Sequence, residues 1–417
     1  MSDAPASDLR AVINDPATVR RRCHAVAAAV ERGQSPHFRL DRSALPAIAQ
    51  RIAALTRRRF PDLQIPYHSR WRHFEAGGVD RQEAIDAQVR PLGSAGLARA
   101  RIDLALISVL LDAGAGPDWH YDEAETGQRL ARSEGLAVAT LRAFAAGAFS
   151  SVPDEPCRVD AQALLAIDAA RLAPMFQVGP ANPLVGLEGR AALLRRLGEV
   201  MQAQPERFGP EGRPGRLFDR LAGRALMRSA GPPALQATEL LAELLASLAP
   251  IWPSGQHIDG LPVGDVWPHP AASAPDEVAA GQVPFHKLSQ WLTYSLLEPF
   301  EWAGIAIQGL DALTGLPEYR NGGLLIDGGA LVPRAADFAA LPKTVDDPWV
   351  IEWRALTVAL LDDLAPLVRA ELGVEARQLP LACMLEGGSW AAGREIAAER
   401  RPGGTPPLRI DSDGTVF

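Results

Sequence analysis

The sequence predicts a mainly α-helical, multi-helix globular protein with one or two small β-hairpins. Apolar residues recur at helical spacing over most of the chain, strand-like alternation is rare, and no repeat of fixed period is present. Strands do not alternate with helices in the way that builds a parallel sheet. The 417 residues, of which 47% are apolar and 22% charged, have an ordinary globular composition and the length of two or three domains.

Helices are predicted where an apolar stripe is bounded by capping or breaking residues. Pro16 begins the first helix, and Ser133 is a candidate N-cap for a later one. A further helix-like run follows residue 284. The other predicted helices span residues 16–29, 44–59, 97–113, 133–149, 159–172, 191–204, 216–228, 234–248, 349–372 and 389–400.

Two segments are candidates for β-hairpins. In the tail, PLRI and TVF flank the turn sequence DSDG. Gly323–Ile326 and Ala330–Val332 flank Asp327-Gly-Gly, which predicts either a second hairpin or a turn between helices. Residues 250–284 hold many Pro and Gly residues, and long loops of this kind tend to line sites. We therefore expect either an N-terminal helical region over residues 1–250 and a C-terminal helical region over residues 251–417 with the proposed active site, or one continuous globule without a boundary.

Charge and cysteine content argue against several classes of protein. Broad binding to nucleic acid or to anionic membranes needs a positive field, whereas the net charge is −8. The three cysteines are far apart and odd in number, which argues against a disulfide framework. The N-terminal sequence MSDAPASDLR lacks the basic start and apolar core of a signal peptide, and no apolar run is long enough to span a bilayer. We expect a cytoplasmic location.

Residues 284–329 hold the best candidates for catalysis. His286 and Lys287 lie at the start of the helix-like run, and a Gly- and Pro-rich turn later presents Glu318, Tyr319 and Arg320. A lysine and a carboxylate in these places could meet across a pocket. The more common role of such residues is an ion-pair network that fixes a turn onto a helix.

A second candidate stretch is IPYHSRWRHF at residues 65–74, where helical and strand periodicity are both weak. Arg70, Arg72 and His73 could form an anion site in an otherwise acidic protein. The alternative is a cationic surface loop that Trp71 and Phe74 pin to the core.

Asp103 and Asp112 interrupt the otherwise apolar helix predicted over residues 97–113. Because a buried carboxylate needs a partner, each is a candidate for a structural or a functional role. The structural reading, a helix-end or ion-paired aspartate, is the favoured one.

Motifs of several enzyme classes are missing. His68 and His73 are five residues apart, and His257 and His269 are isolated, so neither set is specific for a metal and no cofactor is predicted. The chain has neither a Gly-x-Ser-x-Gly elbow nor a Gly-x-x-x-x-Gly-Lys phosphate loop. Carboxylate chemistry remains. Cleavage at the anomeric carbon of a ribose passes through an oxocarbenium-like state that a carboxylate stabilises, while an acid protonates the leaving group.

Eight stretches, in the same order, resemble the URC-four (Urg-three) family of the uracil-catabolism pathway, formerly a domain of unknown function. They are IPYHSRWRHF, LALISVLLDAGAGPDWHY, RSEGLAVATL, NPLVGLEGRAALLRRLG, VPFHKLSQWLTYSLLEPF, GLPEYRNGGLLID, VIEWRALTVALLD and SDGTVF. The resemblance extends from about Val12 to Phe417. It implies a role in pyrimidine breakdown through a ribosylurea-type intermediate.

Three motifs, FHKLSQWL, LPEYRNGGLL and VIEWRALTVALL, also resemble the queuosine-salvage N-glycosylases, whose fold is similar to helix-hairpin-helix DNA glycosylases. This resemblance covers about the last third of the chain. It places the family's active-site lysine on Lys287 and its active-site aspartate on Glu318, so that glutamate replaces aspartate here. Glu352, in the third motif, matches a position that would face the same pocket.

The two resemblances and the residue chemistry lead to one hypothesis, which is hydrolysis of the N-ribosyl bond of a ribosylurea, or of its 5′-phosphate, with release of urea. Glu318 would act as the nucleophile or as the base that activates water, and Lys287 would orient it or stabilise the phosphate or the leaving group. The residues expected to bind this small nucleoside- or nucleotide-like substrate are His286, Tyr319, Arg320, Glu352, Arg70, Arg72 and His73. One alternative is a metal-dependent amidohydrolase or deaminase that attacks the ureido carbon. Another is a non-catalytic protein that binds the intermediate or other pathway enzymes.

Overall fold

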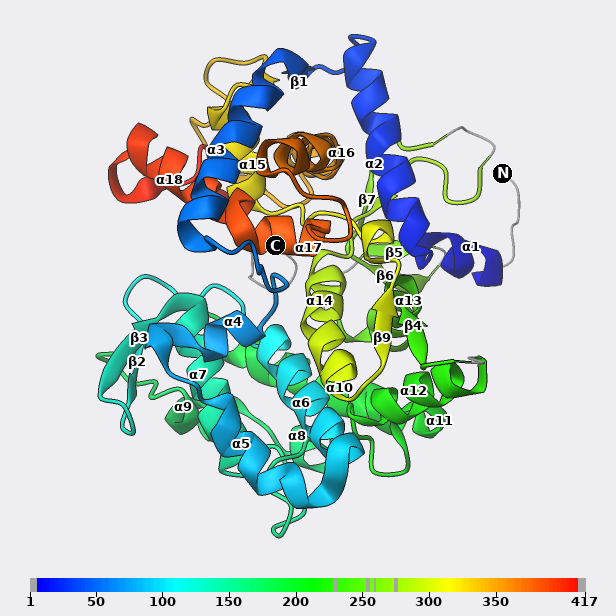
Figure 1. Ribbon diagram of the computed structural model, residues 1–417, viewed down its shortest axis with the longest axis vertical. Coiled ribbons are helices and arrows are strands. Elements are labelled where there is room, and N and C mark those ends of the chain that lie inside the picture. The colour runs from blue at the N-terminus through cyan, green and yellow to red at the C-terminus, as the bar shows by residue number, and fades with distance from the viewer. Residues whose placement is uncertain (1–5, 229–230, 253–255, 259, 274–276, 412–417) are drawn as a thin grey trace.

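The chain is mainly α-helical, and its strands are short and pair two by two (Figure 1). The computed structural model describes residues 6–228, 231–252, 256–258, 260–273 and 277–411. This architecture confirms the predicted fold class. No helix in the described part of the chain combines the length and the hydropathy that crossing a bilayer requires.

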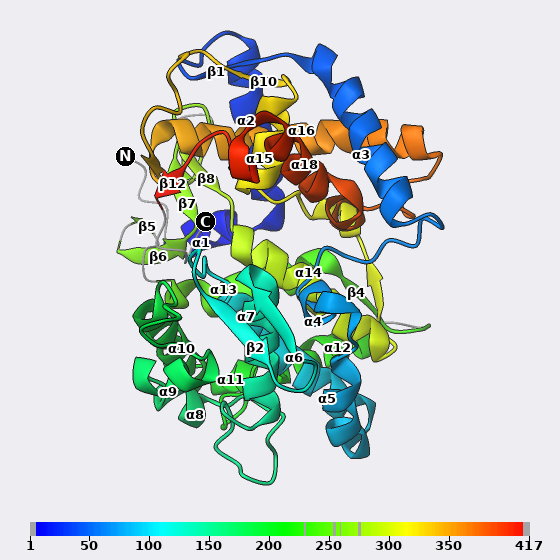
Figure 2. The same cartoon turned by 90° about the vertical axis from the view of Figure 1, so that its left-hand side faces the viewer.

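The helices form two halves, which can be followed in both views (Figures 1 and 2). One half holds α1 (Ala6–Ile13), α2 (Pro16–Glu31), α3 (Leu45–Arg59), α15 (Tyr319–Asp327), α16 (Pro348–Leu372), α17 (Leu381–Met384) and α18 (Trp390–Arg400). The other holds α4 (Trp71–Phe74), α5 (Gln82–Val89), α6 (Gly93–Leu110), α7 (Arg132–Ala145), α8 (Ala161–Leu165), α9 (Ala169–Met175), α10 (Leu187–Gln202), α11 (Pro205–Phe208), α12 (Arg216–Arg228) and α13 (Ala237–Leu248). Helix α14 (Lys287–Trp302) lies between the halves and packs against α6 and α13.

Helix α16 is the centre of the first half. Asp347 caps it by accepting the N–H of Trp349 at 2.8 Å, Pro348 occupies its first turn, and Gly373 ends it in a left-handed conformation. Helices α2 and α3 both pack along α16, whose residues are mostly buried. Segments from the two ends of the sequence therefore share one hydrophobic core.

Two glycines allow α15 to lie between α16 and α18. A Cβ atom on Gly322 would come within 2.6 Å of the Trp353 ring of α16, and one on Gly393 would come within 2.2 Å of the Arg320 carbonyl oxygen. Both distances are far below van der Waals contact. Glycine is thus needed at these positions for the close approach of the three helices.

Among the described residues, three of the six strand pairs join segments that are distant in the sequence. Antiparallel pairs are β1 (Phe38–Leu40) with β10 (Leu331–Pro333), β2 (His120–Glu123) with β3 (Gln128–Ala131), β5 (Gln256–Ile258) with β6 (Leu261–Gly264), and β7 (Val266–Pro268) with β8 (Gln282–Pro284). Parallel pairs are β4 (Ala234–Gln236) with β9 (Ala306–Gln308), and β11 (Lys343–Thr344) with β12 (Ile410–Asp411). The loop predicted over residues 250–284 thus carries short strands.

Several local predictions need correction. The hairpin proposed around Asp327 is wrong, because Gly323–Ile326 lies inside α15, and β10 pairs with β1. The helix predicted over residues 159–172 is two helices, since Asp160 and Asp168 each cap a separate one. The N-cap of α7 is Ala131, without a side-chain hydrogen bond, so Ser133 lies in the first turn.

The structure does not test three other predictions about the organisation of the chain. The tail hairpin includes residues 412–417, which lie outside the described residues. The division of the chain near residue 250 and the likeness of its C-terminal part to helix-hairpin-helix glycosylases stay predictions.

Candidate active site

A cavity of about 790 Å³ lies where the two halves meet beside the N-terminal end of α14. Its volume is within the range of small-molecule sites. Five of the nine residues predicted for the site line it, namely Lys287, Glu318, Tyr319, Arg72 and His73. The structure therefore brings together the lysine, the carboxylate and part of the 65–74 stretch.

Glu318 is held in the cavity wall as the N-cap of α15. Its Oε2 accepts the N–H of Arg320 at 2.8 Å, and its Oε1 accepts the N–H of Asn321 at 2.6 Å. The usual N-cap residues have shorter polar side chains, so a glutamate that caps with both oxygens is unusual. The two hydrogen bonds fix the carboxylate of Glu318, a residue that is only 7% exposed, in the cavity wall.

Lys287 is positioned by a buried anchor between β7 and α16. The carboxylate of Asp265 accepts a hydrogen bond from the backbone N–H of Lys287 at 3.0 Å. It also accepts hydrogen bonds from both terminal nitrogens of Arg354, each at 2.7 Å. Trp267 also donates its indole N–H to Asp265, at 2.6 Å. The arginine of the VIEWRALT motif thus fixes the first turn of α14, and with it the lysine.

Burial changes the pKa of both central residues. It raises the pKa of Glu318, against the opposing effects of the two backbone N–H groups and of Lys287. It lowers the pKa of Lys287, against the opposing effect of the Glu318 carboxylate. Each group therefore shifts toward its neutral form, which brings the two proton affinities closer together and favours proton transfer in the cavity.

The 65–74 stretch is partly buried and contacts both α14 and α7, with Ser69, Arg70, Trp71 and Phe74 buried and its other residues half-buried. The buried Trp71 and Phe74 do pin it to the core. Arg70 is fully buried and pairs with Asp112 at 3.0 Å, so it does not reach the cavity. Arg72 lines the cavity but pairs with Glu298 at 2.9 Å.

Histidine 73 also lines the cavity. Its pKa is well below the ordinary value, first because of burial and then because of the nearby Arg70 charge. A neutral imidazole is therefore present at this wall at physiological pH. Its ring lies edge-on to that of Trp291, another residue of the cavity wall, with centroids 5.9 Å apart.

Two of the predicted binding residues are engaged elsewhere. The Nε2 atom of His286 donates to the carbonyl oxygen of Ile13 at 3.0 Å, which ties α14 to the end of α1. Arg320 donates to the carbonyl oxygen of Gly404 at 2.9 Å, and its guanidinium lies 5.0 Å from the centre of the Tyr319 ring. Neither residue lines the cavity.

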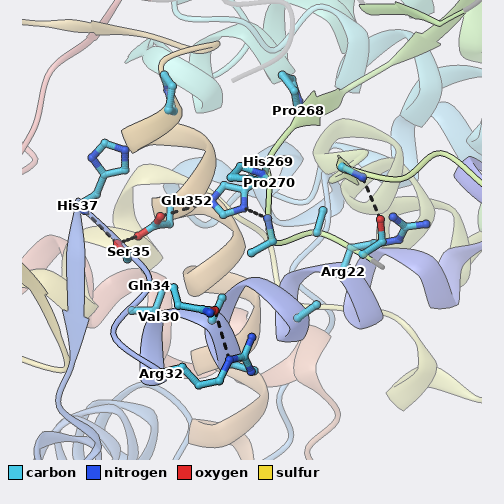
Figure 3. A pocket seen from close by; sticks show the side chains of 18 of the residues that line it. Arg22, Val30, Arg32, Gln34, Ser35, His37, Pro268, His269, Pro270 and Glu352 are labelled. Atoms are coloured by element: carbon cyan, nitrogen blue, oxygen red, sulfur yellow. Dashed lines mark hydrogen bonds and ion pairs between the residues drawn. The ribbon is translucent and has the colours of Figure 1, made fainter. Parts of the chain in front are cut away.

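Glu352 lies at a different cavity, of about 1030 Å³, between α2 and the segment that follows β7 (Figure 3). It accepts hydrogen bonds from the hydroxyl of Ser35 and from Nε2 of His269, the latter at 3.3 Å. The other ring nitrogen of His269 accepts the N–H of Ala271 at 3.2 Å, which assigns the ring proton to Nε2. Through these hydrogen bonds the two carboxylate oxygens of Glu352 connect α16 to Ser35 and to His269. Glu352 therefore does not face the cavity that Lys287 lines, contrary to the expectation from the sequence.

Several charged residues of the first cavity are not indicated as site residues by the sequence. They come from four separate segments and are Arg59, Asp112, Arg132, Glu134, Glu386 and Arg394. Only Asp112 carried a local signal, because it interrupts an apolar helix. Glu386 is already engaged at the wall, where it is hydrogen-bonded to Nδ1 of His68 at 2.9 Å and forms an ion pair with Arg59 at 3.0 Å. Arg132 and Arg394 make no ion pair with any described residue.

Within the described residues, no three His, Cys, Asp or Glu side chains gather in an arrangement that could hold a metal ion. The cavity instead offers carboxylates, a lysine, arginines and aromatic walls. Such a set can bind a polar, anionic small molecule and can move protons within it.

Comparison with known proteins gives concordant matches along nearly the whole chain. The family model described as "Protein of unknown function (DUF1688)" matches residues 12–417. A protein of Lachancea kluyveri named "Uracil catabolism protein 4" is 39% identical over 412 residues, which cover 92% of this chain and 93% of that protein. "Protein urg3" of Schizosaccharomyces pombe is 40% identical over 406 residues, which cover 96% of each chain.

Proposed function

Because this chain belongs to the DUF1688 family, and a relative spanning nearly its whole length is named for uracil catabolism, we propose that it acts in uracil catabolism as an N-ribosyl hydrolase. The proposed substrate is a ribosylurea or its 5′-phosphate, and the products are urea and the free sugar or sugar phosphate. The observation that carries this proposal is the presence of Lys287 and Glu318 in the wall of one cavity, each with a shifted pKa.

The roles follow from the chemistry of the bond. Departure of the urea nitrogen leaves positive charge on C1′ and O4′ of the ribose, which a carboxylate stabilises. Glu318 takes a proton from the attacking water, whose oxygen bonds to C1′. The C1′–N bond breaks, and the leaving nitrogen takes a proton from the Lys287 ammonium, whose lowered pKa favours this transfer. Transfer of the proton from Glu318 to Lys287 restores both groups.

Two arginines suit the phosphorylated form of the substrate. Arg132 begins α7 on one side of the cavity, and Arg394 belongs to α18 on the other. Since neither makes an ion pair with a described residue, both are free to bind a phosphate, whereas Arg59 and Arg72 are already paired. Tyr319, which is more than a third exposed, supplies an aromatic wall for the sugar.

Product analysis tests the proposal. Purified protein is incubated with ribosylurea or ribosylurea 5′-phosphate, and urea, ammonia and the sugar are measured. We expect urea and sugar in equal amounts without ammonia. Ammonia with the ribosyl bond intact would instead indicate the amidohydrolase or deaminase. Tight binding with no products at all would favour the non-catalytic binding protein.

A further inference from the structure

Asp112 is a second carboxylate in the wall of the candidate active site. It follows the last turn of α6 and lines the same cavity as Lys287 and Glu318. Its side chain is 8% exposed. It therefore comes from the opposite half of the molecule to Glu318 and lines the same cavity.

Asp112 forms an ion pair with the fully buried Arg70, whose Nη1 atom lies 3.0 Å from Oδ1 of the carboxylate. The Nε atom of Arg70 donates to the hydroxyl of Ser108 at 2.8 Å, and Nη1 donates to the carbonyl oxygen of Ser133 at 3.2 Å. The guanidinium also lies 5.7 Å from the centre of the Trp291 ring. With its partner fixed on three sides, the carboxylate cannot turn away without leaving a buried cation unpaired.

We propose that Asp112 is a catalytic carboxylate that stabilises the positive charge developing on the ribosyl ring. This inference rests on the proposed function for the identity of the ring. An oxocarbenium-like state gains most from negative charge that is already oriented, because no reorganisation is then needed during the reaction. Glu318 loses its negative charge when it takes the proton of the attacking water. A second carboxylate, Asp112, then supplies the negative charge that stabilises the ribosyl cation.

The charges around Lys287 support this arrangement. The carboxylates of Glu318 and, more weakly, Asp112 both oppose the lowering of the Lys287 pKa by burial, so both act on the same ammonium group. Glu318 and Asp112 thus line the same cavity as Lys287, and the charges of both carboxylates reach its ammonium group. When Lys287 gives up its proton, the ribosyl cation replaces it as the positive partner of the carboxylates.

The competing explanation is that Asp112 only neutralises Arg70. Asp112→Asn is nearly isosteric, and Asp86→Asn is its matched control. Asp86 is similarly buried, accepts from a single arginine, Arg101, at 3.1 Å, and does not line the cavity. We expect Asp112→Asn to lower kcat roughly 100-fold with KM changed less than about threefold, and Asp86→Asn to leave both parameters close to wild type.

A double variant separates the two explanations. Arg70→Met with Asp112→Leu removes both charges, so a role limited to neutralising Arg70 predicts recovery of wild-type kcat. The catalytic role predicts that the loss of kcat persists in the folded double variant. Recovery of kcat in the double variant, or an Asp112→Asn kcat no lower than that of Asp86→Asn, would overturn the inference.

A binding experiment tests the inference without catalysis. The probes are 1,4-dideoxy-1,4-imino-D-ribitol, whose ring nitrogen is cationic, and neutral 1,4-anhydro-D-ribitol, with calorimetry on the full-length protein. We expect wild type to prefer the cation roughly tenfold or more and Asp112→Asn to lose most of this preference. If wild type hydrolyses no ribosylurea but shows this Asp112-dependent preference, the proposed reaction fails and the carboxylate assignment stands. If the preference is absent or unchanged in the variant, the assignment fails.

Discussion

Replacing Glu318 by glutamine separates its capping role from its catalytic role. The glutamate accepts two backbone N–H groups, at 2.8 and 2.6 Å, whereas a glutamine has only one acceptor oxygen and turns its amide N–H₂ toward the second donor. Loss of one charge-assisted hydrogen bond at a buried position costs about 2 kcal/mol of unfolding free energy. A domain with an ordinary stability of at least about 5 kcal/mol stays more than about 99% folded after this loss.

The catalytic consequence of Glu318→Gln is expected to be much larger than partial unfolding can explain. Removing a general base lowers kcat roughly 100- to 10,000-fold. The assay measures urea release at saturating ribosylurea 5′-phosphate, and urea denaturation of the same preparation measures the unfolding free energy. Turnover at the wild-type rate by the folded variant would refute the assigned role.

Glu318→Asp is the matched variant, because it keeps the charge. Aspartate is a favoured N-cap, so stability is expected to change by less than about 1 kcal/mol. The carboxylate withdraws by one methylene, about 1.5 Å, and a displacement of this size costs roughly 100-fold in rate. If the Glu318→Asp variant kept both the stability and the turnover rate of the wild type, Glu318 would act only as a helix cap.

Three further predictions concern the surroundings of Glu318. Turnover is expected to fall as pH rises through the lowered pKa of Lys287, below its ordinary value of 10.5, because the neutral amine cannot protonate the leaving group. Lys287→Arg should move this limb of the pH–rate profile upward, since guanidinium does not titrate in this range. Arg394→Gln should raise KM for ribosylurea 5′-phosphate up to about fivefold and leave KM for ribosylurea unchanged, as steady-state kinetics on both substrates will show. Burial raises the pKa of Glu298 from 4.5 to about 7, so the unfolding free energy of the wild type should fall by about 3 kcal/mol as pH rises from 4.5 to 7, relative to Glu298→Gln. The unfolding free energies of both proteins are measured by denaturation at pH 5 and pH 8. An equal change in unfolding free energy between these pH values in the two proteins would contradict the raised pKa of Glu298.

The sequence predicted the fold class and the start of the candidate site because both depend on local patterns. Helical periodicity and caps such as Asp347 define most of the long helices. Lys287 and Glu318 were predicted from motifs, and the structure places both at one cavity. Their catalytic roles stay predictions.

The remaining features depend on contacts between distant segments. Nothing near Arg70 in the sequence indicates that Asp112 pairs with it, and the position of Glu352 at a second cavity depends on Ser35 and His269. Gly323–Ile326 resembled a strand, but the Glu318 cap begins a helix four residues earlier. A residue pattern shows which groups are available, whereas tertiary packing decides which of them share a cavity.

The most direct test of the proposed active site is a crystal structure of the protein soaked with ribose 5-phosphate, the product of the phosphorylated substrate. We expect density in the cavity between the two halves, with C1 within about 3.5 Å of the Glu318 carboxylate, the ring beside Asp112, and the phosphate on Arg132 and Arg394. Density for the sugar at the Glu352 cavity, or in the first cavity with C1 turned away from both carboxylates, would contradict it.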